Sequence, residues 1–240
     1  MNAKKKSVSA VGRESTMKKR SGSVRTGDST TNDRSDAATK AWLAKHEYPL
    51  VPNDRLSLIS LTGHDYPKLR GTFAKVWDRL ANNLRSQLLQ GWHKRANQHH
   101  LYPRIPWIVA VPAWPSRTPD EFGLVHPSGV EVRFIAPLIE LMPEDLAIGV
   151  VARELGYAYA FLAGPVKYGP MWAVQPRSVW TAELQPIVQA FEESVGCRDL
   201  TAKLVDWAQT PAAVALSEEL EKDAFWLNHT VSQDAGFIYM

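Results

Sequence analysis

The sequence predicts a mixed α+β domain in which a small β-sheet lies between helical regions, and three observations support this class. Apolar residues recur every three or four positions from residue 68 to about residue 92, as in an amphipathic helix. Short β-rich runs bounded by Pro and Gly follow between residues 104 and 136. A long apolar segment at 143–163 precedes further helical segments. This grouping of strands between helices favours an α+β fold.

Composition sets the general class of the protein. With 240 residues, of which 45% are hydrophobic and 22% charged, the chain can bury a substantial core, so residues 41–240 are expected to form one domain. The single Cys197 excludes an internal disulfide and a multi-cysteine zinc site, which favours a cytoplasmic protein. No run of 18 apolar residues and no apolar secretory signal is present, so we expect no membrane span.

The basic character of the chain is concentrated in residues 1–40. This segment holds ten Lys/Arg against four Asp/Glu, whereas the remainder holds 18 against 21. It has almost no large apolar side chains and is expected to be a disordered tail. The basic runs Lys4–Lys6 and Lys18–Arg20 could contact nucleic acid phosphates or an anionic membrane surface. A purely solubilising tail is the alternative.

The first helix and strand are defined by their prolines. The helix should begin at Pro67, because Pro is favoured at the first helical position, and should run to about Trp92. RIPWIVAVP at 104–112 predicts a short strand. The segments 121–125 and 130–136 flank the turn-rich HPSG and predict a β-hairpin.

Helices are expected in the second half of the chain. Pro143 followed by two acidic residues is typical of a helix start, and Gly164-Pro165 is a strong stop signal. The middle of this helix reads VARELGYAYA. Further helices are expected near 179–195, 198–209 and 211–228, the last opened by Pro211.

Polar residues in VARELGYAYA have the spacing of a metal-binding motif. Arg153 and Tyr157 lie on one face of a helix at i and i+4, and Glu154 lies beside Arg153. In H-E-x-x-H two histidines at this spacing bind zinc and the glutamate activates a metal-bound water. The stretch therefore resembles the zincin metallopeptidases, in particular gluzincins, as a degenerate member in which both histidines are replaced.

The resemblance implies a fold and a third ligand position. Zincins have a backing helix, a small sheet with an edge strand beside the cleft, the active-site helix and C-terminal helices, of which one donates a glutamate in gluzincins. Glu183, 26 residues after Tyr157, is the first candidate for that position. If the helix begins at Pro186, Glu183 lies outside it, and Glu192 and Glu193 are the alternatives.

Ligand chemistry argues against hydrolysis. A guanidinium has no lone pair to donate to a metal, so zinc is expected to be lost and no cofactor to be present. Without a metal, Glu154 is a vestigial general base with no activated water. We expect Arg153 to replace the cation and to bind a carboxylate of the following helix, Glu183 in the first place.

Binding residues are expected around the cleft. Trp114 and Trp172 fall in loops and could contact a peptide or a glycan, although loop anchors packed on the core are the alternative. An extended peptide or protein partner could add as a strand along 130–136, near Val132 and Phe134.

The sequence thus predicts a catalytically inactive, metallopeptidase-like binding or structural module. Three alternatives remain open. The protein could be an active metal-dependent hydrolase with Glu154 as base and unusual ligands, or a nucleic-acid-associated protein that binds through its tail. RELGYAYA could also be an ordinary packing helix, in which Gly156 and the alanines let another element approach closely.

Overall fold

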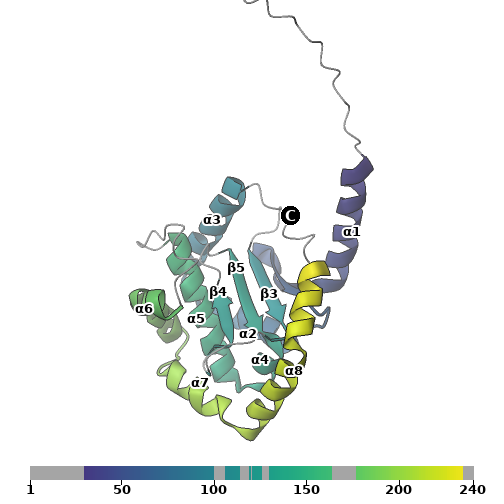
Figure 1. Cartoon of the computed structure of the whole chain (residues 1–240). Coiled ribbons are helices and arrows are strands. Elements are labelled where there is room, and N and C mark those ends of the chain that lie inside the picture. The colour runs from purple at the N-terminus through teal and green to yellow at the C-terminus, as the bar shows by residue number, and fades with distance from the viewer. Residues whose placement is uncertain are drawn as a thin grey trace, which may run out of the picture.

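A computed structural model describes residues 30–99, 106–113, 119, 121–125, 130–163 and 177–234. Helices surround a five-stranded sheet in this part of the chain (Figure 1). The elements are α1 (Thr30–His46), β1 (Glu47–Val51), the 3-10 helix η1 (Pro52–Asp54), β2 (Leu56–Ser60), α2 (Pro67–Arg79), α3 (Asn82–His99), β3 (Trp107–Val111), β4 (Gly123–Val125), β5 (Glu131–Ile135), α4 (Ala136–Leu141), α5 (Glu144–Ala163), α6 (Arg177–Ser194), α7 (Leu200–Ala208) and α8 (Pro211–Asp234).

The sheet is mixed, with the strand order β1-β2-β3-β5-β4. β2, β3 and β5 run parallel, whereas the outer strands β1 and β4 are antiparallel to their neighbours. The α+β class and the predicted hairpin are confirmed, since β4 pairs with β5 from Gly123↔Phe134 to Val125↔Val132. Parallel strands need long crossover connections, and the helices α2 and α3 lie between β2 and β3.

The expected peptide-binding strand is not at the edge of the sheet. β5 pairs with β3 on one side and with β4 on the other, so its backbone groups are already used and strand addition there is excluded. The side chains of Val132 and Phe134 are fully buried and belong to the core. The prediction of a binding surface along 130–136 was therefore wrong, and the edge strand next to α5 is β4.

The predicted helix from residue 68 to about residue 92 is in fact two helices. It begins at Pro67 as expected, but Leu80 adopts an extended conformation (φ −64°, ψ 137°) that ends α2. A continuous helix would hold residues 77 and 92 about 22 Å apart. The break instead allows α3 to turn back, so that Trp77 and Trp92 stack with ring centroids 6.1 Å apart. Aromatic packing overrides the local periodicity here.

The N-terminal boundary of the domain also differs from the prediction. Residues 30–40, which were expected to belong to the disordered tail, are part of α1. Within this helix the Trp42 and His46 rings stack at 3.9 Å, and His46 Nδ1 lies 2.8 Å from the Trp42 carbonyl oxygen. β1, β2 and α4 were not predicted. The runs Lys4–Lys6 and Lys18–Arg20 lie outside the described residues, so nucleic acid contact by the tail stays a prediction.

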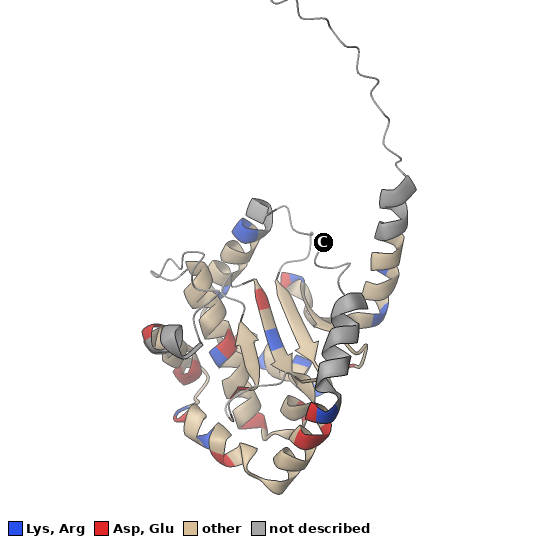
Figure 2. Ribbon diagram, in the orientation of Figure 1, with Lys and Arg blue, Asp and Glu red and all other residues tan. Residues whose placement is uncertain are grey.

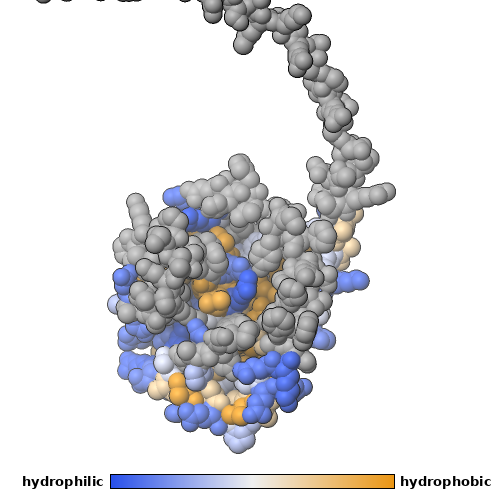
Figure 3. All heavy atoms as spheres, viewed as in Figure 1, coloured by the Kyte–Doolittle hydropathy of each residue, from blue (hydrophilic) through white to orange (hydrophobic). Residues whose placement is uncertain are grey.

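Helix α5 is more deeply buried than the outer helices. Charged residues lie mostly on the outer helices (Figure 2), and hydrophilic residues surround hydrophobic ones on the face shown in Figure 3. Among the described helices α5 is long and apolar enough to cross a bilayer, but 83% of its apolar window is buried inside the fold. It contacts α2, α3, α6 and α7 as well as β4 and β5. We therefore interpret it as the central core helix.

Close packing between α5 and α6 depends on Gly156. A Cβ atom added to this residue would lie 3.0 Å from the Val188 Cα and 3.2 Å from the Phe191 Cβ. Because the first of these neighbours is backbone, it cannot move away without shifting α6. The proposal that Gly156 permits close helix approach is thus confirmed, and it is compatible with a special function of the polar residues nearby.

We predict that Gly156→Ala destabilises the protein by roughly 1–3 kcal/mol, because the added methyl group overpacks the α5–α6 contact. Gly71→Ala on α2 is the matched control, since a Cβ there meets no atom within 4 Å. That change should stabilise the fold by about 0.5–1 kcal/mol through the higher helix propensity of Ala. Urea unfolding of both variants measures the difference. Equal stability of the two variants would contradict the packing argument.

Candidate functional site

The middle of α5 places Arg153, Glu154 and Tyr157 in the interior of the protein. Their exposed fractions are 7%, 1% and 3%, although arginine and glutamate side chains are normally charged and face water. A buried charge is costly unless it is paired and hydrogen-bonded, so each of these side chains requires a compensating environment. For Arg153 the structure provides that environment from α6 and α7, and Glu154 packs against β4.

Arg153 is paired with a carboxylate of the following helix. Its Nε donates to Glu192 Oε1 at 2.7 Å, and its Nη2 donates to Thr201 Oγ1, also at 2.7 Å. The Arg153 and Glu192 side chains are only 8% and 7% exposed. The guanidinium therefore connects α5 with α6 and with the first turn of α7 through charge-assisted hydrogen bonds.

Glu192, and not the expected Glu183, is the partner that the structure gives to Arg153. Helix α6 begins at Arg177 and contains Pro186 internally, so Glu183 does lie in the helix, but its side chain is exposed. The inner face of α6 is formed by the buried residues Leu184, Val188 and Phe191. At helical spacing Glu192 continues this face, whereas Glu183 lies outside it. Glu192, one of the two alternatives named from the sequence, is therefore the residue that pairs with Arg153.

Glu154 lies between α5 and the edge strand β4. A Cβ atom added to Gly123 would lie 2.6 Å from Glu154 Cδ and 2.8 Å from its Oε1. Only glycine at this position allows β4 to approach the carboxylate so closely. The residue predicted as a vestigial base is thus next to the strand that borders the α5 helix, but it is buried, so bulk water does not reach it.

The tyrosines of the motif differ in their environments. Tyr157 is buried, whereas the half-buried Tyr159 donates its hydroxyl to Gln87 of α3 at 2.6 Å. The Tyr159 ring packs against Phe191 with centroids 5.3 Å apart. Tyr159 therefore links α3, α5 and α6, which is a structural function consistent with an amphipathic aromatic side chain.

Other predicted binding residues are not tested by these observations. Trp114 and Trp172 lie outside the described residues. Within the described part of the chain, no group of three His, Cys, Asp or Glu side chains is arranged to hold a metal ion. Thr201 is a contact of the site that the sequence did not suggest. The sequence feature that could have indicated Thr201 is its place at the start of α7, where a short polar side chain can face a neighbouring helix.

Cys197 has no features of an activated nucleophile. Its thiol donates to the Asp145 carbonyl oxygen at 3.3 Å. Burial raises the pKa of the thiol above its ordinary value, and the negative charge of Asp145 raises it further. Because the thiolate is the reactive form, this environment lowers its reactivity. A cysteine-dependent enzyme is not supported.

Comparison of the chain with protein-family models, with curated proteins and with solved structures found no match. The chemistry of the site must therefore be inferred from its own residues.

We predict that Glu192→Ala lowers the free energy of unfolding by roughly 3–5 kcal/mol, because it removes one partner of a buried ion pair. Glu183→Ala on the same helix is the control and should change stability by less than about 0.5 kcal/mol, since Glu183 is exposed. Thermal and urea unfolding provide the measurement. A larger effect at Glu183 than at Glu192 would refute the assigned pairing.

We also predict slow alkylation of Cys197. At pH 8 the native protein should react with iodoacetamide more slowly than the urea-unfolded chain, because the raised pKa reduces the thiolate fraction and burial limits access. Mass spectrometry of the modified chain gives both rates. A native rate equal to or above the unfolded rate would show that the thiol is activated.

Proposed function

We propose that this protein is a metallopeptidase-like scaffold without peptidase activity, which acts as a binding or structural module. The order of its elements supports the likeness to zincins: helices α2 and α3, a mixed sheet with an antiparallel edge strand, the long helix α5 and the following helix α6. The place of Glu154 between α5 and that edge strand supports it as well.

The observation that carries the proposal is the buried contact of Arg153 with Glu192 and Thr201. Arg153 occupies the position of the first metal histidine in the H-E-x-x-H spacing, and its positive charge meets a carboxylate from the following helix, as a metal ion would. A guanidinium is permanently protonated and delivers its charge without any bound ion. The site is therefore held together by a side chain in place of a cation.

The same replacement accounts for the loss of hydrolysis. Peptide hydrolysis by the zincin mechanism needs a metal that lowers the pKa of a bound water to about 7. The guanidinium cannot coordinate water as a Lewis acid, and its electrostatic repulsion opposes binding of a divalent ion beside it. Glu154 then lacks a nucleophile to activate. Without catalysis, the packed arrangement of α5, α6 and β4 serves mainly to stabilise the fold.

The proposal predicts that metal binding can be restored. In Arg153→His plus Tyr157→His, two imidazoles at i and i+4 would face Glu192, which is a set of three zinc ligands. The double variant should bind zinc stoichiometrically, as measured by elemental analysis after dialysis. Adding Glu192→Gln to the double variant is the matched control and should weaken zinc binding at least tenfold.

Wild-type protein provides a test that does not depend on the folding of a variant. It should hold less than stoichiometric zinc and should not cleave unfolded casein. Tightly bound transition metal together with casein cleavage that is abolished by Glu154→Gln would refute the proposal in favour of the active hydrolase.

A further inference from the structure

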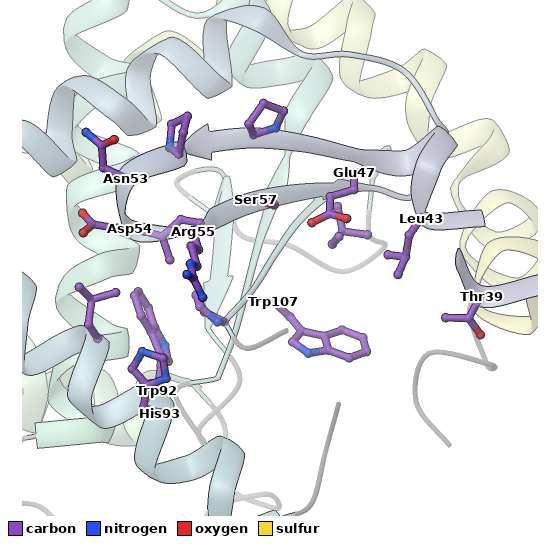
Figure 4. Close-up of a pocket in the computed structure, with 16 residues that line it drawn as sticks. Thr39, Leu43, Glu47, Asn53, Asp54, Arg55, Ser57, Trp92, His93 and Trp107 are labelled. Carbon is purple, nitrogen blue, oxygen red and sulfur yellow. The ribbon is translucent and has the colours of Figure 1, made fainter. Parts of the chain in front are cut away.

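A cavity of about 720 Å³ lies on the side of the sheet formed by β1 and β2, away from the elements discussed above. It is bordered by α1, the β1–β2 connection and α3, and Trp107 of β3 contributes to its wall (Figure 4). The volume is within the range of about 300–1,000 Å³ that is typical of small-molecule sites. No residue of α5, α6 or α7 lines it, so it is distinct from the Arg153 site.

Arg55 is held in the cavity wall by an unusual backbone conformation. Its φ of 57° is in the left-handed region, and its N–H donates to the Pro52 carbonyl oxygen at 3.1 Å, which closes the η1 turn. This conformation costs a residue with a side chain about 1–2 kcal/mol, and such strain is often found at functional sites. The turn projects the guanidinium between the Trp92–His93 side of the cavity and Trp107 (Figure 4).

The side chains of Arg55 and His93 are two hydrogen-bond donors in the cavity wall. Neither the Arg55 guanidinium nor the exposed His93 imidazole has a hydrogen-bond or ion-pair partner in the described part of the chain. The neighbouring Asp54 forms no ion pair with Arg55 in the described part of the chain, and its Oδ2 accepts a hydrogen bond from Trp77 Nε1 at 2.6 Å. This part of the cavity is therefore suited to an anionic group.

The rest of the cavity offers a flat apolar surface. Trp107 is half-buried, and Figure 4 shows its ring in the cavity between Arg55 and Leu43. Figure 4 shows Leu43 and Thr39 at the end of the cavity away from Trp92 and His93. An aromatic ring can stack on the indole while its acidic substituent reaches the two donors.

We propose that this cavity binds a small planar aromatic acid, with its ring on Trp107 and its carboxylate or phosphate on Arg55 and His93. The proposal does not rest on the metallopeptidase-like function, because the two sites share no residue. The ligand is defined by three features of the cavity: its volume, its flat aromatic wall, and the Arg55 guanidinium and His93 imidazole in its wall.

Calorimetric titration of the full chain with three probes tests the ligand class. 2-Naphthoate and 2-naphthyl phosphate carry the ring and an acid, and 2-naphthamide is the neutral analogue of similar shape. We expect at least one of the acids to bind, and to bind about ten- to hundredfold more tightly than the amide, because a hydrogen bond to a charged group is lost in the amide. Whichever acid binds more tightly identifies the acidic group.

Two variants test the residues. Arg55→Asn removes the charge but keeps a residue that tolerates the left-handed conformation, so the fold should be preserved. It should weaken binding of the acid about tenfold or more and leave binding of the amide unchanged. Lys94→Gln is the matched control, since this exposed cation is adjacent to His93 on α3 but does not line the cavity. It should bind the acid as the wild type does.

Nuclear magnetic resonance locates the bound ring without relying on a charge change. The indole N–H signal that disappears in Trp107→Phe identifies Trp107, and this signal should shift when the acid is added to the wild type. The proposal is overturned by any of three results: neither acid binds, the amide binds as tightly as the acids, or Arg55→Asn binds the acid with wild-type affinity. A bound probe that leaves the Trp107 signal unshifted would overturn it too.

Discussion

The buried contact between Arg153 and Glu192 is the constraint on which the arrangement of α5, α6 and α7 depends. Each of these charges would be costly in the interior on its own, so the presence of one requires the other. Thr201 accepts a further guanidinium hydrogen bond, which adds the start of α7 to the same cluster. Ordinary apolar contacts between helices tolerate small rotations and shifts. A charge-assisted hydrogen bond at 2.7 Å does not, and it sets the register of these helices.

Helix α5 combines this polar cluster with very close packing. Gly156 allows α6 to approach its backbone, and Gly123 of β4 allows the strand to approach Glu154 on another side of the helix. The Ala- and Gly-rich composition of α5 therefore has a packing function, while the few polar residues specify its neighbours. The two initial interpretations of VARELGYAYA, a packing helix and a degenerate metal-binding helix, are compatible. In either case, the polar chemistry that the structure shows at this helix is the buried ion pair of Arg153 with Glu192.

The Arg153 cluster and the cavity that Arg55 lines differ in whether their polar groups are available to a ligand. In the α5 cluster the guanidinium is engaged with its neighbours and removed from water, which suits stability and not recognition. In the cavity beside β1 and β2, Arg55 is exposed and has a strained left-handed backbone conformation. Its guanidinium forms no ion pair within the described part of the chain. Binding energy is available where polar groups still face solvent. If the protein is a binding module, this cavity is therefore the more suitable place for a ligand.

The sequence by itself determined the elements whose signals are local. The start of α2 at Pro67, the β4–β5 hairpin, the extent of α5 and the start of α8 at Pro211 follow from proline placement, alternation and helix-stop residues, and all were predicted. Only the tertiary structure decided the break at Leu80, the interior place of β5 and the choice of Glu192 over Glu183. The tertiary structure also decided that Arg55, His93 and Trp107 line the same cavity. The physical reason is that strand order, helix crossing and aromatic stacking are set by contacts between residues far apart in the chain, and no local pattern contains them.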